Sequence, residues 1–417
     1  MLIKTILNYV EKFKSFTYVQ DYFEMVHDSK SLIVEISARK NSKGECSRCG
    51  KRCQTYDRLR PRDYQYVPLW NIPTYFRYQS RRVTCPDHGV IVEKVSWASG
   101  KDRLTRSYKL FLASWAKRLS WKETAETFKT SWNSVYRSVS WVVEYGLNNR
   151  DWDNVEQIGV DEIAVFKGHK YLTCVYQLDQ GFRRLLWCGK DRHAKTLLRF
   201  FFEFGKTRSE RLKFVCSDMW PAYLKVIKKK CTNAINILDR FHIAKKINGA
   251  VDQVRRDEVK QLKADGQDNV LANGRWLLLK KPENLTEKQA PKLKELINLN
   301  LSSIKAYLMK EDFQRFWCYK SATWAGKFLD DWTQRSHKSE LKPMSKAANT
   351  LTKHKSLILN WFKANGMLSS GAVEGLNNKA KLTIKKAYGF KTLGCLQIAL
   401  YHQLGKLKEP PSTHRFC

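Results

Sequence analysis

The sequence has no run of 18 or more apolar residues, so a membrane-spanning helix is not expected. The N-terminal segment contains the charged residues Lys4, Glu11, Lys12 and Lys14, so it lacks the unbroken apolar core of a signal peptide. Internal repeats and low-complexity tracts are also absent. The 11 cysteines are odd in number and mostly isolated, which argues against a disulfide scaffold. We therefore expect a protein of a reducing cytoplasm.

Acidic residues are scarce relative to basic ones. Lys and Arg total 76 against 40 Asp and Glu, which gives a formal net charge of +36. Such a charge repels itself unless a polyanion neutralises it, and nucleic acid is the common polyanion. Hydrophobic residues make up 43% of the sequence, which excludes wholesale disorder. The length of 417 residues predicts two to four domains.

Two short cysteine motifs stand in the N-terminal region. Cys46-Ser-Arg-Cys49-Gly50 is a CxxCG knuckle, and Cys85-Pro-Asp-His88-Gly89 is a CxxHG knuckle. Paired knuckles bring two ligands each to one tetrahedral Zn²⁺, and the glycine permits the tight turn. We predict one structural zinc ion held by Cys46, Cys49, Cys85 and His88. Cys53 is a competing ligand, and unrelated reduced cysteines are the alternative interpretation.

The segment from Leu104 to Trp141 has the pattern of helix, turn, helix. Ser107 is a candidate N-cap, and Ser120 with Glu123 three residues later forms a candidate capping box. The length and polarity are typical of a helix-turn-helix, in which Asn133, Ser134 and Arg137 would face a DNA groove. An ordinary helical hairpin is the alternative.

From Gln157 onward, strand-like and helix-like runs alternate. Three strand-like runs with short glycine-containing connectors predict an antiparallel meander, and helices then alternate with two further strands. This is the order of a ribonuclease H-like fold. The runs are Ile158–Val165, Lys170–Leu178, Arg183–Cys188, a helix at His193–Phe204, Leu212–Asp218, a helix from Pro221, and Ala234–Asp239.

Three carboxylates are candidates for one catalytic site. Asp161 lies in the middle of a predicted strand, where a carboxylate is disfavoured without a compensating cation. Asp218 lies at the carboxyl end of a strand, where α/β sheets usually place their sites. Glu374 belongs to a predicted helix. Two Mg²⁺ ions (or Mn²⁺), about 3.5–4 Å apart, would remove the repulsion and act on a phosphodiester. Carboxylates merely paired with basic residues are the alternative.

The helix around Glu374 has two faces at 100° per residue. Its polar stripe would contact a DNA backbone, whereas its apolar stripe would pack. The polar stripe is Glu374, Asn377, Asn378, Lys381 and Lys385, and the apolar stripe is Val373, Leu376, Ala380, Ile384 and Ala387.

Weaker candidates surround these acids. Glu162 should point away from Asp161 and pair with a lysine. Asp239 and His242 follow another strand, where they either lie near the site or serve as a helix cap and a partly buried histidine. Trp220 would pack in the core or stack on a base.

Long, ungapped motifs run from the second knuckle to about Leu404. They are CxxHGVxxExxxWA at Cys85–Ala98, GVDEIAxxKGHxYLT at Gly159–Thr173, SDMWPAY at Ser217–Tyr223, DRFHIxK at Asp239–Lys245, RWLLLKxPENLT at Arg275–Thr286, VEGLNNKxK at Val373–Lys381 and AYGF at Ala387–Phe390. With these motifs, the chain resembles the ISL-three family of bacterial insertion-sequence transposases of the DDE class. The resemblance implies Asp161, Asp218 and Glu374 as the catalytic acids, an N-terminal zinc finger and an adjacent DNA-binding helical domain.

The expected fold is therefore multidomain α+β: a zinc-ribbon-like finger, a helix-turn-helix domain and a ribonuclease H-like core interrupted by an all-helical insertion. The resemblance explains the separation of 156 positions between Asp218 and Glu374 by that insertion. The expected boundaries are 1–97 for the zinc-finger segment, 98–150 for the helix-turn-helix, 151–246 for the first part of the core, 247–366 for the insertion, 367–405 for the final core helix and 406–417 for the tail.

The resemblance implies a DNA transposase that binds the terminal inverted repeats of its own element. It would cleave the element ends in a metal-dependent reaction and join them to target DNA. Its partners would be double-stranded DNA and further copies of itself, as a homodimer or larger assembly, with no membrane. We expect it in the bacterial cytoplasm, associated with the nucleoid. The alternatives are a catalytically inactive, transposase-derived regulator and a plain metal-dependent nuclease.

Overall fold

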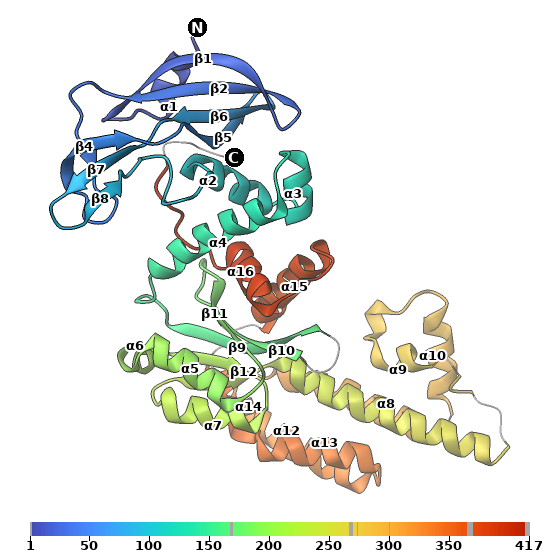
Figure 1. Cartoon of the computed structure of the whole chain (residues 1–417). Coiled ribbons are helices and arrows are strands. Elements are labelled where there is room, and N and C mark those ends of the chain that lie inside the picture. The colour runs from blue at the N-terminus through green and yellow to red at the C-terminus, as the bar shows by residue number, and fades with distance from the viewer. Residues whose placement is uncertain are drawn as a thin grey trace. The chain divides into compact units, whose positions relative to one another are not determined.

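The computed structural model describes residues 2–166, 170–266, 270–272, 274–299, 301–364 and 370–412. The chain divides into two compact units, one combining Met1–Asp151 with Ala380–Cys417 (unit 1) and the other Trp152–Lys379 (unit 2). Both units contain helices and strands, which confirms the predicted α+β class (Figure 1). The predicted connector at 167–169 and the end of the predicted tail at 413–417 lie outside the described residues. In the described part of the chain, every helix is too short or too polar to cross a membrane.

The first sheet of unit 1 has the strand order β1-β2-β6-β5. One face covers an aromatic core centred on Trp97, which is fully buried. The rings of Phe13, Phe16, Tyr64 and Tyr78 surround Trp97 at centroid distances between 4.9 and 5.9 Å. The elements are α1 (Ile3–Val10), β1 (Phe16–Val26), β2 (Ser29–Ala38), β5 (Arg62–Leu69) and β6 (Ile72–Tyr78).

The second sheet of unit 1 has the order β3-β4-β7-β8. Its strands are β3 (Gly44–Glu45), β4 (Arg52–Arg58), β7 (Arg81–Cys85) and β8 (Gly89–Val92). The two cysteine knuckles form the turns from β3 to β4 and from β7 to β8. Strands β5 and β6 intervene in the chain between β4 and β7 but belong to the first sheet. This excursion explains why the two knuckles lie so far apart in the sequence.

The helical part of unit 1 follows the predicted pattern, with one correction. Ser120 and Glu123 form the predicted capping box at the start of α3. The N-cap of α2 is Thr105, whose side chain accepts from the Tyr108 amide, so the prediction of Ser107 was wrong. Ser107 instead donates to a carboxylate oxygen of Glu11 at 2.9 Å. The helices are α2 (Arg106–Ala116), α3 (Trp121–Thr127), α4 (Trp132–Asn148) and α16 (Leu393–Leu404), and α16 packs against α4.

Unit 2 is built on a five-stranded sheet of order β11-β10-β9-β12-β13. The first three strands in the chain form the predicted antiparallel meander, and β12 and β13 run parallel to β9 on its other side. The strands are β9 (Gln157–Phe166), β10 (Lys170–Gln177), β11 (Arg184–Lys190), β12 (Phe214–Ser217) and β13 (Ile235–Leu238). Helices α5 (Ala194–Phe204), α6 (Lys206–Arg211) and α7 (Pro221–Lys230) connect β11 to β12 and β12 to β13.

A helical assembly follows β13. Its core contains the fully buried Trp332 with the rings of Phe313 and Phe316. Helix α8 is continuous from Arg240 to Ala264, so the predicted boundary between 246 and 247 falls inside it. The domain boundaries themselves stay predictions. The helices are α8 (Arg240–Ala264), α9 (Arg275–Leu279), α10 (Gln289–Ile297), α11 (Ser302–Phe313), α12 (Ala322–Lys338), α13 (Lys342–Lys353) and α14 (Lys355–Lys363), with short 3₁₀ turns at Pro282–Asn284 and Gln314–Cys318.

Helix α15 (Ser370–Lys386) carries Glu374. Its predicted apolar stripe is buried at Val373, Leu376 and Ala380. This burial orients the opposite, polar stripe and positions the candidate site.

Candidate functional site

The sheet of unit 2 brings Asp161 and Asp218 together. Strands β9 and β12 are parallel neighbours with Gly159 opposite Cys216. Strand β12 ends at Ser217, and extending the register by two residues sets Asp218 beside Asp161. Asp161 and Asp218 therefore lie at neighbouring positions where β12 ends, and the carboxyl ends of strands are where such sheets place their sites.

A third aspartate and a histidine border this pair. Asp239 follows β13 in the same register, beside Asp218, and caps α8 by accepting from the Phe241 amide at 2.8 Å. His242, in the first turn of α8, lies with its Nε2 3.8 Å from Asp161 Oδ1. The interaction with Asp161 raises the pKa of His242 more than partial burial lowers it. Asp239 therefore serves as the helix cap that the sequence suggested, and His242 lies near Asp161, which was the other interpretation of this pair.

Helix α15 is packed directly onto β9. Gly159 has no Cβ, and a Cβ there would come within 2.7 Å of Val373 Cγ2, so the close approach requires glycine. Asn377 donates from Nδ2 to Asp161 Oδ2 at 2.5 Å and accepts at Oδ1 from the Tyr176 hydroxyl at 2.7 Å. Asn377 is thus buried beside the first acid. This differs from the predicted DNA-facing position of Asn377, because both ends of its amide are bound within the protein.

Glu374 lies one helical turn before Asn377 and is exposed. Within the described residues, the zinc-type set Cys46, Cys49, Cys85 and His88 is the only group of three or more potential ligands that lie within 4.8 Å of one another. The structure therefore brings two of the three predicted acids together and leaves Glu374 on the adjoining helix. Of the other predicted DNA contacts on α15, Asn378, Lys381 and Lys385 are all exposed.

Arg192 is a site residue that the sequence analysis did not identify. Its Nε lies 2.7 Å from Glu162 Oε1, and its Nη2 lies 3.1 Å from Asp218 Oδ2. The predicted lysine partner of Glu162 was therefore wrong. Burial raises the pKa of Glu162 to about 7, with the Asp218 charge adding to the rise and Arg192 opposing it. The signal that could have identified Arg192 is its position two residues after β11, at the edge where the acids gather.

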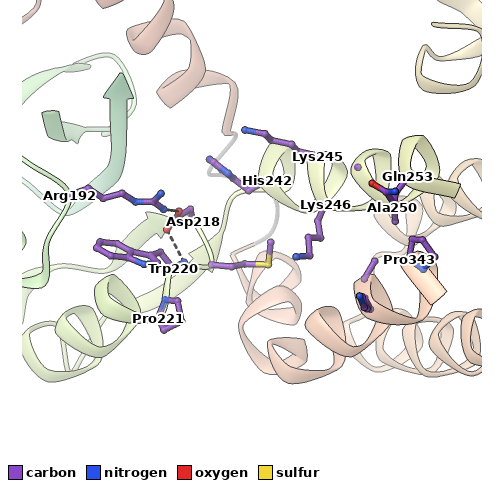
Figure 2. A pocket seen from close by; sticks show the side chains of 14 residues that line it. Arg192, Asp218, Trp220, Pro221, His242, Lys245, Lys246, Ala250, Gln253 and Pro343 are labelled. Atoms are coloured by element: carbon purple, nitrogen blue, oxygen red, sulfur yellow. Dashed lines mark hydrogen bonds and ion pairs between the residues drawn. The ribbon is translucent and has the colours of Figure 1, made fainter. Parts of the chain in front are cut away.

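Trp220 is half-buried at the same edge. The Arg192 guanidinium lies 4.6 Å from the centroid of the Trp220 ring, and Tyr223 meets the ring edge-on at 4.6 Å. The Trp220 amide donates to Asp218 Oδ1 at 2.9 Å. Figure 2 shows Arg192, Asp218 and Trp220 gathered at one end of a pocket. Trp220 thus fixes both Asp218 and Arg192 rather than filling the core alone.

The two cysteine knuckles bring together the four predicted zinc ligands. Contact distances are 3.6 Å for Cys49 Sγ to Cys85 Sγ, 3.7 Å for Cys46 Sγ to His88 Nδ1 and 3.5 Å for Cys85 Sγ to His88 Nδ1. A tetrahedral zinc with Zn–S of about 2.3 Å and Zn–N of about 2.0–2.1 Å has edges of about 3.4–3.8 Å. The donor set therefore fits zinc in both chemistry and spacing.

Two further features support this metal centre. Gly50 and Gly89, which close the knuckles, have φ of 75° and 64°, values that favour glycine. Cys53 is outside the ligand set, and its Sγ donates to the Lys51 carbonyl at 3.4 Å. Burial raises the pKa of the Cys85 thiol, but the contact with His88 and the neighbouring donors outweigh it and lower the pKa to about 6. Thiolate is the form that binds a metal.

The predicted helix-turn-helix surface lies on α4. Asn133 and Arg137 are exposed on this helix, and Arg137 Nη2 lies 3.2 Å from Asp102 Oδ1. A cavity of about 720 Å³ adjoins Arg137, and four Lys or Arg residues line it together with Asp63 and Asp102. Its lining includes Lys101, Arg103, Lys129, Ser131, Ser134 and Arg137. The arrangement suits an anionic ligand on the first turns of α4.

Comparison with known proteins gives one consistent answer. The sequence model of the ISL-three family, described as a transposase, matches residues 158–400. The chain is 28% identical to the transposase for insertion sequence element IS1001 of Bordetella parapertussis, over 83% of this chain and 85% of the relative. It is 26% identical to the transposase for insertion sequence element IS1557 of Mycobacterium tuberculosis, over 93% of this chain and 92% of the relative. Because the family model spans more than half of the sequence, the chain belongs to the ISL-three family of insertion-sequence transposases.

Proposed function

We propose that this transposase binds the terminal inverted repeats of its own insertion sequence, and that Asp161, Asp218 and Glu374 catalyse end cleavage and strand transfer into target DNA. The observation that carries the proposal is the parallel register of β9 and β12, which sets Asp161 and Asp218 side by side. The packing of α15 on β9 adds Glu374 on the adjoining turn. The order of three antiparallel strands followed by two parallel ones supports a ribonuclease H-like core.

The donor set suits divalent cations. Adjacent carboxylates repel each other, and hard oxygen ligands prefer Mg²⁺ or Mn²⁺. Asp161 and Asp218 would hold such ions, with Glu374 as the third carboxylate. Bound ions would supply activation of the attacking oxygen and stabilisation of the leaving oxygen of a phosphodiester.

Other side chains of the site have supporting roles. Asn377 orients Asp161 through Oδ2, and the Glu162 amide donates to Asp161 Oδ1 at 2.8 Å. Arg192 holds Asp218 in a similar way. Both aspartates are therefore fixed in orientation before any ligand arrives, which lowers the entropic cost of assembling the site.

The proposed reaction has two steps. In the first, the oxygen of water forms a bond to the phosphorus at the element end, and the bond to the 3′ oxygen breaks to leave a 3′-hydroxyl. In the second, this hydroxyl forms a bond to a target phosphorus and displaces the target's own 3′ oxygen. One phosphodiester replaces another, so the second step needs no external energy source.

DNA would be held mainly by unit 1. We assign element-end recognition to α3 and α4, with Asn133 and Arg137 toward the bases, and a supporting role to the zinc-bound sheet. Asn378, Lys381 and Lys385 would contact phosphates, so binding should weaken steeply with salt. Handling two element ends in one reaction implies a homodimer or larger assembly.

The test is a cleavage and joining assay with the full, zinc-loaded chain and a duplex that carries the element's ends, with Mg²⁺ or without added Mg²⁺. We expect cleavage and joining only with Mg²⁺. Asp161→Asn, Asp218→Asn and Glu374→Gln should each reduce cleavage by about 10³-fold or more, the scale for removal of a charge-stabilising group, with binding retained. Asp239→Asn is the matched control, because asparagine caps a helix as well as aspartate does.

Other outcomes distinguish the alternatives. Specific binding without cleavage in Mg²⁺ or Mn²⁺ would identify a regulator, and cleavage without joining or end preference would identify a nuclease. If Asp239→Asn reduced cleavage as much as Asp161→Asn, or Glu374→Gln left it intact, the assignment of the three acids would be wrong.

A further inference from the structure

An elongated pocket of about 580 Å³ leads away from Asp218 within unit 2. It runs between α8 and α13, and we call it the α8–α13 groove. Figure 2 shows Arg192 and Asp218 at one end and Gln253 and Pro343 at the other. The residues that line it are Arg192, Asp218, Met219, Trp220, Pro221, His242, Lys245, Lys246, Gly249, Ala250, Gln253, Pro343, Lys346 and Ala347.

The groove carries uncompensated positive charge. Lys245, Lys246 and Lys346 are exposed, and no side-chain amino group of the three has an ion pair or hydrogen bond within the part of the chain that the structure describes. Asp218 is the single acidic residue among those that line the groove, and Arg192 already binds it. Three unpaired lysines in one groove repel one another, and a polyanion relieves that repulsion.

The dimensions fit one strand of nucleic acid. His242, Lys246, Gly249 and Gln253 recur at three- and four-residue spacing and share one face of α8. The eleven helical steps from His242 to Gln253 span about 16 Å at 1.5 Å per residue, the length of about four to five nucleotides of B-form DNA. The volume spread over that length corresponds to a passage about 6 Å across, which accommodates one strand and not the two strands of a duplex.

Gly249 is a second, independent sign of a closely approaching ligand. It is exposed in the middle of a 25-residue helix, where glycine is unfavourable. A Cβ at Gly249 would meet no atom within 4 Å, so nothing in the protein's own packing requires glycine there. Its lack of a side chain leaves the floor of the groove open to a ligand backbone.

We propose that the α8–α13 groove holds a single DNA strand that continues from the phosphate at the acidic residues, with Lys245, Lys246 and Lys346 on its phosphates. The helical segment after β13 is then a strand-binding element that fixes the direction in which DNA leaves the active site. This inference rests on the proposed function, because it assumes that the acidic residues act on DNA.

The test measures binding without added Mg²⁺ or Mn²⁺, by fluorescence anisotropy, of two labelled probes. One is a blunt duplex ending at the cleavage position, and the other carries a five-nucleotide single-stranded extension, tried on each strand. Wild-type protein should bind one of the extended probes about tenfold more tightly than the blunt one. Lys246→Gln with Lys346→Gln should abolish this preference and reduce the salt slope by about 1.4, since each single-strand phosphate contact contributes about 0.7.

The matched control is Lys260→Gln with Lys353→Gln, which removes the same charge from exposed positions of α8 and α13 outside the groove. It should keep the preference for the extension. Gly249→Gln should raise the thermal midpoint or leave it unchanged, yet abolish the preference, because the added side chain occupies the floor of the groove.

Equal affinity of wild-type protein for blunt and extended probes would overturn the inference, as would equal losses in the groove and control variants. These results would leave Mg²⁺-dependent cleavage by the acidic residues untouched. Conversely, a lysine-dependent preference for the extension in a protein that never cleaves would support the groove and refute the proposed function.

Discussion

His402 is a buried histidine with an unusual environment. It lies on α16, and neither ring nitrogen has a hydrogen-bond partner in the described residues. Burial lowers the pKa of His402 to about 3, and the nearby charge of Lys117 adds to the effect. The folded protein therefore holds this ring neutral at pH values where an unfolded chain, with an ordinary pKa near 6.5, would bind a proton.

The stability of unit 1 should consequently fall in acid. Between pH 6.5 and about 3, the unfolded state binds the extra proton at His402, so the free energy of unfolding rises with pH across that window. From pH 6.5 to 5 we expect a loss of about 2 kcal/mol. Urea unfolding at several pH values measures it. His402→Phe should flatten the dependence and the exposed His337→Phe should not, whereas equal pH profiles for His402→Phe and wild type would contradict this account.

Residue-level roles were only partly predictable from the sequence. Asn377 and Asn378 are identical neighbours on the predicted polar stripe, yet Asn377 is buried against Asp161 and Asn378 is exposed. Helical periodicity defines a polar face only to within about 100° around the helix axis. It therefore cannot tell which of two adjacent residues at the border of that face is buried. Arg192 was missed for a different reason, because its partners Glu162 and Asp218 lie in other, distant segments of the chain.

At the scale of elements, the zinc knuckles give the sharpest prediction. Cys49→Ser should abolish zinc binding, and Cys53→Ser should retain one zinc per chain, because only Cys49 belongs to the ligand set. Structural zinc sites contribute on the order of 10 kcal/mol, so Cys49→Ser or chelation should unfold the β3-β4-β7-β8 sheet.

Metal analysis of purified protein and circular dichroism before and after chelation provide the measurements. Loss of zinc from Cys53→Ser, or retention of zinc by Cys49→Ser, would refute the assigned ligands. The comparison is balanced because both substitutions replace one thiol by one hydroxyl in the same sheet.

Elements formed by local pairing were predictable, and those formed by distant pairing were not. The meander of β9, β10 and β11 follows from alternating apolar residues with short connectors. In unit 1, β2 pairs in parallel with β6 at Leu32 and Thr74, more than forty residues apart in the chain. No local pattern specifies such a partner, so the first sheet of unit 1 could not be assembled from the sequence.

At the scale of the whole molecule, unit 1 is made from both ends of the chain. Gln403 donates from Nε2 to the Lys117 carbonyl at 2.9 Å, and Lys117 pairs with Glu409. Helix α16 also buries Leu396, Leu400 and Leu404. Helix α16 therefore contributes to the N-terminal unit, although the sequence analysis assigned residues 367–405 to the final core helix.

We accordingly expect a fragment of residues 1–151 to be much less stable than the same fragment mixed with a peptide of residues 380–412. Each buried leucine contributes about 1.5–3 kcal/mol, so the peptide should raise the thermal midpoint by many degrees. Thermal unfolding followed by circular dichroism tests this. An unchanged midpoint on addition of the peptide would count against the shared core.

The excursion of β5 and β6 between the two knuckles has a consequence for biosynthesis. The ribosome makes Cys49 36 residues before Cys85. At about 5–20 residues per second, the first pair of thiols waits about two to seven seconds for the second. During that interval, Cys46 and Cys49 lack the other two proposed ligands, so we expect the supply of zinc during translation, and not only afterwards, to affect how many chains fold correctly.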